Sequence, residues 1–234
     1  MSARRRLLGA AVVAAAVALP AAALAYFLPL EFVLGKLGEH QARITDVKVE
    51  QDVHFYGDAV PGGHVAATET LACKTPKAKR VTRLPDGERS VVYGGGAPVV
   101  RGPAAGASWA DPPGVDAFLA MVCGRIGDKT LKAWGLDTSA RGYALYGGDV
   151  AYIIGAKPGE LDRPQLWIDK DRFRPLRFSG KDGAGEVRLV DYDSGRTGAL
   201  YPRVAAFLDR GKLVARFEVR RIAVNAGLAP ADLE

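Results

Sequence analysis

The chain has 234 residues, of which 48% are hydrophobic and 25% charged, and its formal net charge is +6. This length suits one all-β domain or a pair of small domains. Without the three N-terminal arginines Arg4, Arg5 and Arg6 the charge falls to +3, which is too small to favour a nucleic-acid partner.

The first 25 residues have the order of a secretory signal peptide. The three arginines precede an apolar stretch from Leu7 to Leu19, and Ala23-Leu24-Ala25 supplies the small-x-small pattern of a cleavage site. We expect cleavage after Ala25, which leaves residues 26–234 as one exported domain. The alternative is a retained membrane anchor, because the apolar run approaches the ~18 residues that span a bilayer.

The chain contains two cysteines, Cys73 and Cys123. An even number of cysteines in an exported protein favours a disulfide. The sequence alone does not bring their Cα atoms within bonding reach, so two unpaired, half-buried thiols are the alternative.

Two segments have the apolar spacing i, i+3, i+4, i+7 of an amphipathic helix. The first begins at Pro29, which suits a first helical turn, and ends at Gly38. The second follows Gly114 and breaks at Gly124, and a short helical turn is expected over 129–134. The apolar positions are Leu30, Val33, Leu34 and Leu37 in the first helix and Val115, Phe118, Leu119 and Val122 in the second.

Most of the remaining chain alternates apolar and polar residues with the period of a half-buried strand. The dipeptide Asp86-Gly87 marks a hairpin, whereas the Gly-, Ala- and Pro-rich stretch 93–114 is expected to be a loop. The last ten residues are expected to be unstructured. Alternating stretches lie at 44–55, 65–73, 81–84, 91–93, 141–156, 164–178, 186–192, 203–208 and 213–224.

Short, regularly spaced strands with two inserted amphipathic helices predict a mainly β fold with some α-helix. We expect a strongly curved antiparallel sheet, an incomplete β-barrel, with the helices inside its concavity.

The sequence offers little reactive chemistry. The histidines have no metal-binding spacing, and no nucleophile elbow or phosphate-binding glycine pattern is present. Two aspartate pairs could act as acid and base, but aspartates at strand ends favour turns. We therefore expect no catalytic residue, no metal and no cofactor. The histidines are His40, His54 and His64, and the aspartate pairs are Asp169 with Asp171 and Asp191 with Asp193.

Three arginines, Arg172, Arg174 and Arg177, follow the first aspartate pair. They could bind an anionic headgroup. Arginines that alternate along a strand more often form its solvated face, and we expect that role here.

The apolar strand and helix positions could line a container for a hydrophobic ligand. The alternative, which periodicity does not separate from it, is an ordinary filled core. The candidate lid and wall positions are Leu30, Val33, Leu34, Leu37, Val47, Val49, Val53, Phe55, Phe118, Leu119, Val122, Leu166, Ile168, Leu176, Phe178, Leu213, Phe217 and Val219. Trp167 has the opposite strand parity from Leu166 and Ile168, so its side is open.

Residues 148–228 contain "LWID", "PLR", "VRLVDY", "LYP", "DRGKLV" and "VNAGL" in this order. This series resembles the LolA-like superfamily of bacterial outer-membrane lipoprotein-sorting proteins. The resemblance implies a bent, incomplete β-barrel with a helical lid. It also implies a monomeric periplasmic carrier that takes lipoprotein or lipid cargo from an inner-membrane donor to an outer-membrane acceptor. An envelope sensor or interaction module with the same fold is the alternative.

One position departs from that family. The best-known carriers place an arginine before a proline in the loop after an early strand, where it holds the lid closed. The corresponding residues here are Lys74, Thr75 and Pro76. This difference favours a divergent carrier.

Overall fold

The computed structural model describes residues 27–94, 96–102, 111–193 and 201–234. The expected signal peptide, residues 1–25, lies outside the described residues. No helix in the described part of the chain is long and apolar enough to cross a membrane.

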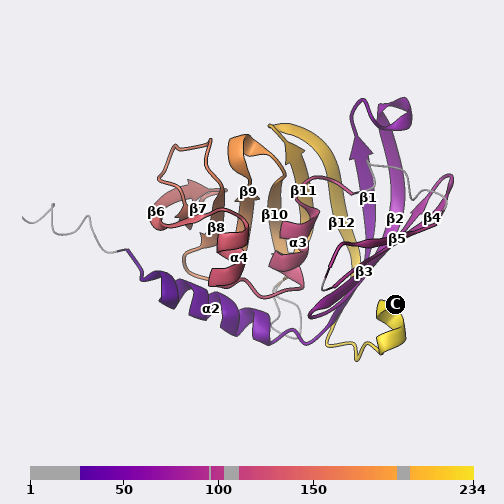
Figure 1. The fold of residues 1–234 in the computed structure, drawn as a ribbon, viewed down its shortest axis with the longest axis horizontal. Helices are drawn as coiled ribbons and strands as arrows, with labels where there is room; N and C mark the ends of the chain where they lie inside the picture. Colours follow the sequence, from indigo (N-terminus) through magenta and orange to yellow (C-terminus); the bar gives the residue numbers. More distant parts are fainter. Residues whose placement is uncertain (1–26, 95, 103–110, 194–200) are drawn as a thin grey trace, which may run out of the picture.

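A single antiparallel sheet of twelve strands forms the described structure (Figure 1). Its spatial order is β5-β4-β3-β2-β1-β12-β11-β10-β9-β8-β7-β6, so the C-terminal strand β12 lies between β1 and β11. The sheet is strongly bent and remains open, with β5 and β6 as its two edges. The strands are β1 Val47–Tyr56, β2 His64–Lys74, β3 Lys77–Leu84, β4 Gly87–Tyr93, β5 Val99–Arg101, β6 Asp137–Tyr146, β7 Asp149–Gly155, β8 Gln165–Asp169, β9 Pro175–Ser179, β10 Glu186–Asp193, β11 Tyr201–Asp209 and β12 Lys212–Val224.

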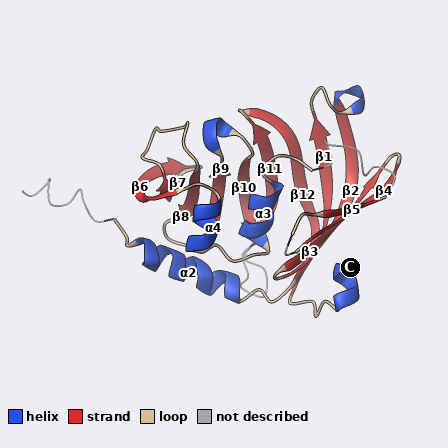
Figure 2. Ribbon diagram, in the orientation of Figure 1, coloured by secondary structure: helices blue, strands red, loops and turns tan. Residues whose placement is uncertain are grey.

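Three α-helices lie on the concave side of this sheet, as Figure 2 shows. Helix α2 spans Leu30–Ala42, α3 spans Val115–Val122 and α4 spans Asp128–Ala133. Helix α3 lies over β9, β10 and β11, α4 contacts the edge strand β6, and α2 lies beneath them along one end of the sheet. Short 3₁₀ turns occur at Pro61–Gly63, Lys181–Gly183 and Pro230–Leu233. The expected curved sheet with helices in its concavity is confirmed.

Helix α2 extends one turn beyond its predicted end. Pro29 caps its first turn, where the Val33 amide donates to the Pro29 carbonyl at 3.1 Å. Gly38 continues the helix to Ala42 rather than ending it. A glycine inside a helix costs only about 1 kcal/mol relative to alanine, which the burial of α2 on the sheet offsets.

Two expected irregular segments contain structure. Residues 99–101 pair with Ser90–Val92 as the edge strand β5, inside the predicted loop 93–114. The prediction of an unstructured C-terminus is wrong, since Pro230–Leu233 forms a 3₁₀ turn and Leu228 and Leu233 pack on Ala72 of β2. These two apolar residues and the hydrogen bonds from Lys74 to the Leu228 carbonyl and from the Gly227 amide to Asp46 dock this end.

Candidate functional site

Helix α2 buries one face against the concave side of the sheet. Leu30, Val33 and Leu37 are buried in the same hydrophobic core as the inward residues of the strands. Leu34 is half-buried against that core, and Phe32 is largely exposed. The heptad-like spacing of the apolar residues thus places α2 as a cover over the apolar interior.

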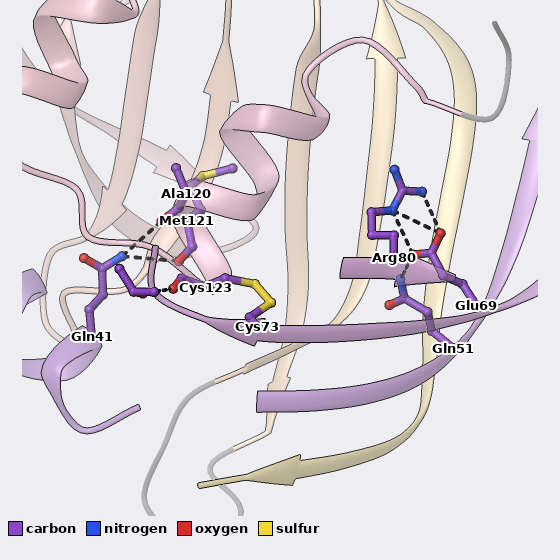
Figure 3. The surroundings of a disulfide bond; sticks show 9 residues. Gln41, Gln51, Glu69, Cys73, Arg80, Ala120, Met121 and Cys123 are labelled. Carbon is purple, nitrogen blue, oxygen red and sulfur yellow. Dashed lines mark hydrogen bonds and ion pairs between the residues drawn. A yellow bond between two sulfur atoms is a disulfide. The ribbon is translucent and has the colours of Figure 1, made fainter. Parts of the chain in front are cut away.

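Polar contacts fasten α2 near both of its ends. Before its first turn, the Leu28 amide donates to the Tyr143 hydroxyl at 3.1 Å, and the Tyr152 hydroxyl donates to the Leu28 carbonyl at 3.0 Å. In its last turn, Gln41 Oε1 accepts a hydrogen bond of 2.9 Å from the Ile126 amide. The Gln41 Nε2 group points to the Ala120 and Met121 carbonyls of α3 at 3.4 Å each (Figure 3).

Aromatic rings fill the interior below the helices. Phe118 of α3 meets Phe207 and Phe217 edge to face, with ring centroids 5.4 and 5.9 Å apart. Phe55 of β1 contacts Phe217 in the same manner at 6.4 Å. All four rings are buried. Edge-to-face contacts of this kind stabilise a core beyond the area that they bury.

The space beneath the lid is small in this conformation. A cavity of about 30 Å³ lies between the C-terminal half of α2, the end of α3 and the neighbouring strand ends, lined among others by Leu37, Gln41, Met121 and Tyr192. Pockets that bind drug-sized ligands measure roughly 300–1,000 Å³. With α2 in this position, the cavity at its C-terminal half is far smaller than such pockets.

The lid and wall candidates lie mainly where the strand and helix periods place them. Sixteen of the eighteen belong to the core under the lid or pack against it, with Leu34 and Val219 only half-buried: Leu30, Val33, Leu34, Leu37, Val47, Val49, Val53, Phe55, Phe118, Leu119, Val122, Leu166, Ile168, Phe178, Phe217 and Val219.

The structure corrects the other two, Leu176 and Leu213. In the β8–β9 pairing Trp167 opposes Arg177 but Ile168 opposes Pro175, so Leu176 is a bulged residue. It packs in a separate cluster with Trp167, which settles the side on which the tryptophan lies. Leu213 lies beside the β11–β12 turn, where the register shifts at Phe207, and it is 42% exposed.

Cys73 and Cys123 form a disulfide, with an S–S distance of 2.06 Å (Figure 3). The bond joins β2 to the residue that caps α3, across a sequence separation of 50 residues. It therefore attaches the α3 cover to the sheet covalently, whereas α2 is attached by noncovalent contacts.

Of the aspartates considered as acid and base, Asp169 has a structural role. Asp169 Oδ1 accepts the Asp171 and Arg172 amides at 3.0 and 2.9 Å, and its Oδ2 pairs with Arg174 at 3.0 Å. This is a turn, as expected. Asp191 has a positive φ of 54° in β10, and the Asp193 side chain lies outside the described residues.

The three arginines of this region are only partly a solvated face. Arg172 is exposed, but Arg174 stacks on Tyr192 and Arg177 pairs with Glu186 at 2.8 Å. Each of the three arginines pairs with a buried carboxylate, Asp169 or Glu186, and Arg172 makes the longest of these contacts, at 3.6 Å.

The described residues contain no group of three or more side chains suited to hold a metal ion. His54 and His64, on neighbouring strands, stack with ring centroids 5.5 Å apart; His54 is half-buried and His64 exposed. His40 lines the cavity under α2, where burial and then the charge of Arg43 lower its pKa.

A buried polar cluster beneath β2–β4 was missed from the sequence. Arg80, 1% exposed, donates through Nε and Nη2 to the Glu69 carboxylate, with the Nη2 contact at 2.6 Å. Gln51 and Thr82 also donate to Glu69, at 2.8 and 2.7 Å. The available signal was the parity of β3, since Arg80 and Thr82 share a face with the buried Ala78 and Leu84.

Asp111 extends this cluster toward the solvent. Its Oδ1 accepts Arg80 Nη1 at 2.8 Å and the Tyr93 hydroxyl at 3.1 Å, and its Oδ2 accepts Arg89 Nη2 at 2.6 Å. Burial alone would raise the pKa of Asp111, but the hydrogen bond from Arg89 and the charge of Arg80 hold it below its usual value. Burial raises the pKa of Tyr93 to about 12.

No protein-family model and no curated protein matches the chain. Solved structures do. An outer membrane lipoprotein-sorting protein domain from Vibrio parahaemolyticus is 12% identical at a TM-score of 0.50, covering 86% of this chain and 95% of that domain. A LolA superfamily protein from Nitrosomonas europaea is 11% identical at a TM-score of 0.53, covering 89% and 98%. The chain has a LolA-like fold.

Within this LolA-like fold, the loop between β2 and β3 holds α3 and the C-terminus. The Thr75 hydroxyl donates to the Cys123 carbonyl at 2.7 Å, and the Lys74 ammonium donates to the Leu228 carbonyl at 3.1 Å. Helix α2 is instead held by the hydrogen bond between Gln41 and the Ile126 amide. Just before the helix, the Tyr143 and Tyr152 hydroxyls bond the Leu28 backbone. The hydrogen bonds that hold the α2 lid are therefore at other positions than the β2–β3 loop, where the resemblance placed the lid-closing arginine of the best-known carriers.

Proposed function

We propose that residues 26–234 act, after removal of the signal peptide, as a periplasmic, non-enzymatic carrier of acyl chains. The carrier binds lipoproteins or related amphiphiles under α2 and moves them from an inner-membrane donor toward an outer-membrane acceptor as a monomer. The observation that carries the proposal is the placement of α2, a helix whose apolar face packs on the hydrophobic core of an open sheet and is fastened to it without a covalent bond.

Loading requires α2 to lift, because about 30 Å³ cannot hold an acyl chain. The three buried side chains of α2 stabilise its closed position by about 1.5–3 kcal/mol each, or roughly 5–9 kcal/mol together. A chain that buries about ten methylenes gains about 8 kcal/mol. The two terms are similar, so the exchange of α2 for an acyl chain is close to balanced and reversible, as a carrier requires.

A neutral amphiphile tests the proposal. We expect purified residues 26–234 to bind dodecyl maltoside saturably below its micelle concentration, measured by displacement of a dansylated fatty acid. Leu37→Asp places a charge on the buried face of α2 and should change the dissociation constant of dodecyl maltoside. Lys36→Ala, on the exposed face of α2, should leave it unchanged. Absence of saturable binding to the unsubstituted protein would refute the carrier proposal.

A further inference from the structure

Two arginines on neighbouring strands point to one carboxylate. Arg80 of β3 and Arg89 of β4 lie on the same face of the sheet, since Arg89 pairs with Thr82, two residues along from Arg80. Each donates to a different oxygen of Asp111, at 2.8 and 2.6 Å. Asp111 precedes Pro112 and the start of α3 rather than belonging to the sheet.

The two arginines are not equally satisfied. Arg80 places its Nε and both terminal nitrogens in hydrogen bonds to Glu69 and Asp111. Arg89 is 4% exposed, and its Nε and Nη1 are buried without a hydrogen-bond partner among the described residues. Buried guanidinium donors without acceptors are rare in folded proteins. The site therefore holds more donors than the two oxygens of Asp111 accept.

We propose that Arg80 and Arg89 form a clamp for the oxyanion headgroup of an amphiphile, a phosphate or a carboxylate, and that Asp111 occupies this clamp in the closed structure. Arginine pairs bind phosphate and carboxylate oxygens through directed, charge-assisted hydrogen bonds. A phosphate offers more oxygens than Asp111 and can also accept from the unpaired donors of Arg89. This inference rests on the proposed function, because the headgroup arrives with an acyl chain.

The clamp adjoins both the apolar interior and the solvent. The guanidinium carbon of Arg80 lies 5.2 Å from the centre of the Phe217 ring, which is part of the aromatic cluster under α3. A crevice of about 180 Å³ between Val60, Pro112 and Val214 reaches Asp111, whose side chain is 27% exposed. In the proposed complex the headgroup replaces Asp111 and its chain runs toward the phenylalanine rings. Figure 3 shows Arg80, Glu69 and Gln51 together, joined by their hydrogen bonds.

Two amphiphiles that differ only in their headgroup distinguish binding of the headgroup from binding of the chain. Dodecyl phosphate and dodecyl maltoside carry the same dodecyl chain, so the ratio of their dissociation constants measures headgroup preference alone. Asp111→Asn removes the competing charge and should increase the preference for dodecyl phosphate by on the order of tenfold or more. Arg89→Gln should abolish the preference while dodecyl maltoside binds as before. Arg83→Ala, an exposed arginine of the same strand β3, is the control and should preserve it.

Equal preference in Arg89→Gln and Arg83→Ala would overturn the clamp while leaving acyl binding intact. If neither amphiphile binds any variant, the proposed function fails, and inorganic phosphate then decides the clamp by itself. In that case a shift of the Arg89 Nε–H resonance of Asp111→Asn on phosphate addition supports an oxyanion site independent of lipid, and an unchanged resonance overturns it. Should Arg89→Gln not fold, Arg89→Lys keeps the charge but loses the directed donors, and it should lower the preference in the same assay.

Discussion

Gln41 provides a direct test of the lid because its contacts join α2 to the α3 cover. Gln41→Met keeps the length and helix propensity of the side chain but removes its amide group. The substitution leaves the Ile126 amide without its 2.9 Å acceptor and the Ala120 and Met121 carbonyls without their weaker donor. Methionine can pack against the apolar lining of the same small cavity.

The expected effect follows from the lost hydrogen bond. A part-buried donor left unpaired costs about 1–2 kcal/mol, and this cost falls on the closed state, in which α2 contacts residue 126. The ratio of open to closed lids then rises about 5- to 30-fold. If an acyl chain binds only the open lid, its apparent affinity increases by the same factor until the open state dominates.

Titration of a dansylated fatty acid into Gln41→Met and the unsubstituted protein measures this factor. Lys36→Ala is the control, since it removes the exposed Lys36–Glu39 ion pair of the same helix, which contributes only about 0.2–0.5 kcal/mol. An affinity for Gln41→Met that equals or falls below that of the control, in a protein that remains folded, would refute lid opening as the step that limits binding.

Three further predictions concern stability and titration. Replacing both Cys73 and Cys123 with alanine should lower the free energy of unfolding in urea by about 4 kcal/mol on the chain-entropy model, and a loss below about 1 kcal/mol would contradict that origin. Phe118→Ala, at the centre of the aromatic cluster, should cost about 3–5 kcal/mol in the same assay, whereas a near-neutral result would mean that the ring is not packed as described. The hydrogen bonds from Ser139, then that from Arg163, lower the pKa of Asp137 to about 2, so this carboxylate stabilises the fold above its unfolded pKa and ceases to do so as the pH falls through about 2. Ser139→Ala should raise the pKa of Asp137 toward its usual value by carboxyl NMR, and an unchanged pKa would exclude the hydrogen bond as the cause.

Strand periodicity predicted the apolar interior well where pairing is regular. Val47, Val49, Val53 and Phe55 are all fully buried, as their parity in β1 required. Parity failed at Leu176, because a bulge in the β8–β9 pairing reverses the inside and outside positions. The register of a strand against its neighbour depends on distant residues, and a single sequence does not specify it.

The polar cluster could not be predicted for a different physical reason. Alternation places Arg80 and Glu69 on inward positions, but charged residues there normally signal an outward face. They are tolerated inside because they neutralise each other and because Gln51, Thr82 and Asp111 complete their hydrogen bonds. Thr82 lies on the same strand as Arg80, but Gln51 comes from β1 and Asp111 from the segment before α3, so only the folded structure reveals how the charges are paired.

Hydrogen exchange of α2 tests the central claim most directly. Amides of residues 30–42 should exchange faster when dodecyl maltoside is bound, because the chain occupies the space that α2 covers, while amides of β1 and β12 should keep their protection. Bound ligand with α2 equally or more strongly protected would contradict the account, since the closed lid leaves only about 30 Å³ beneath it.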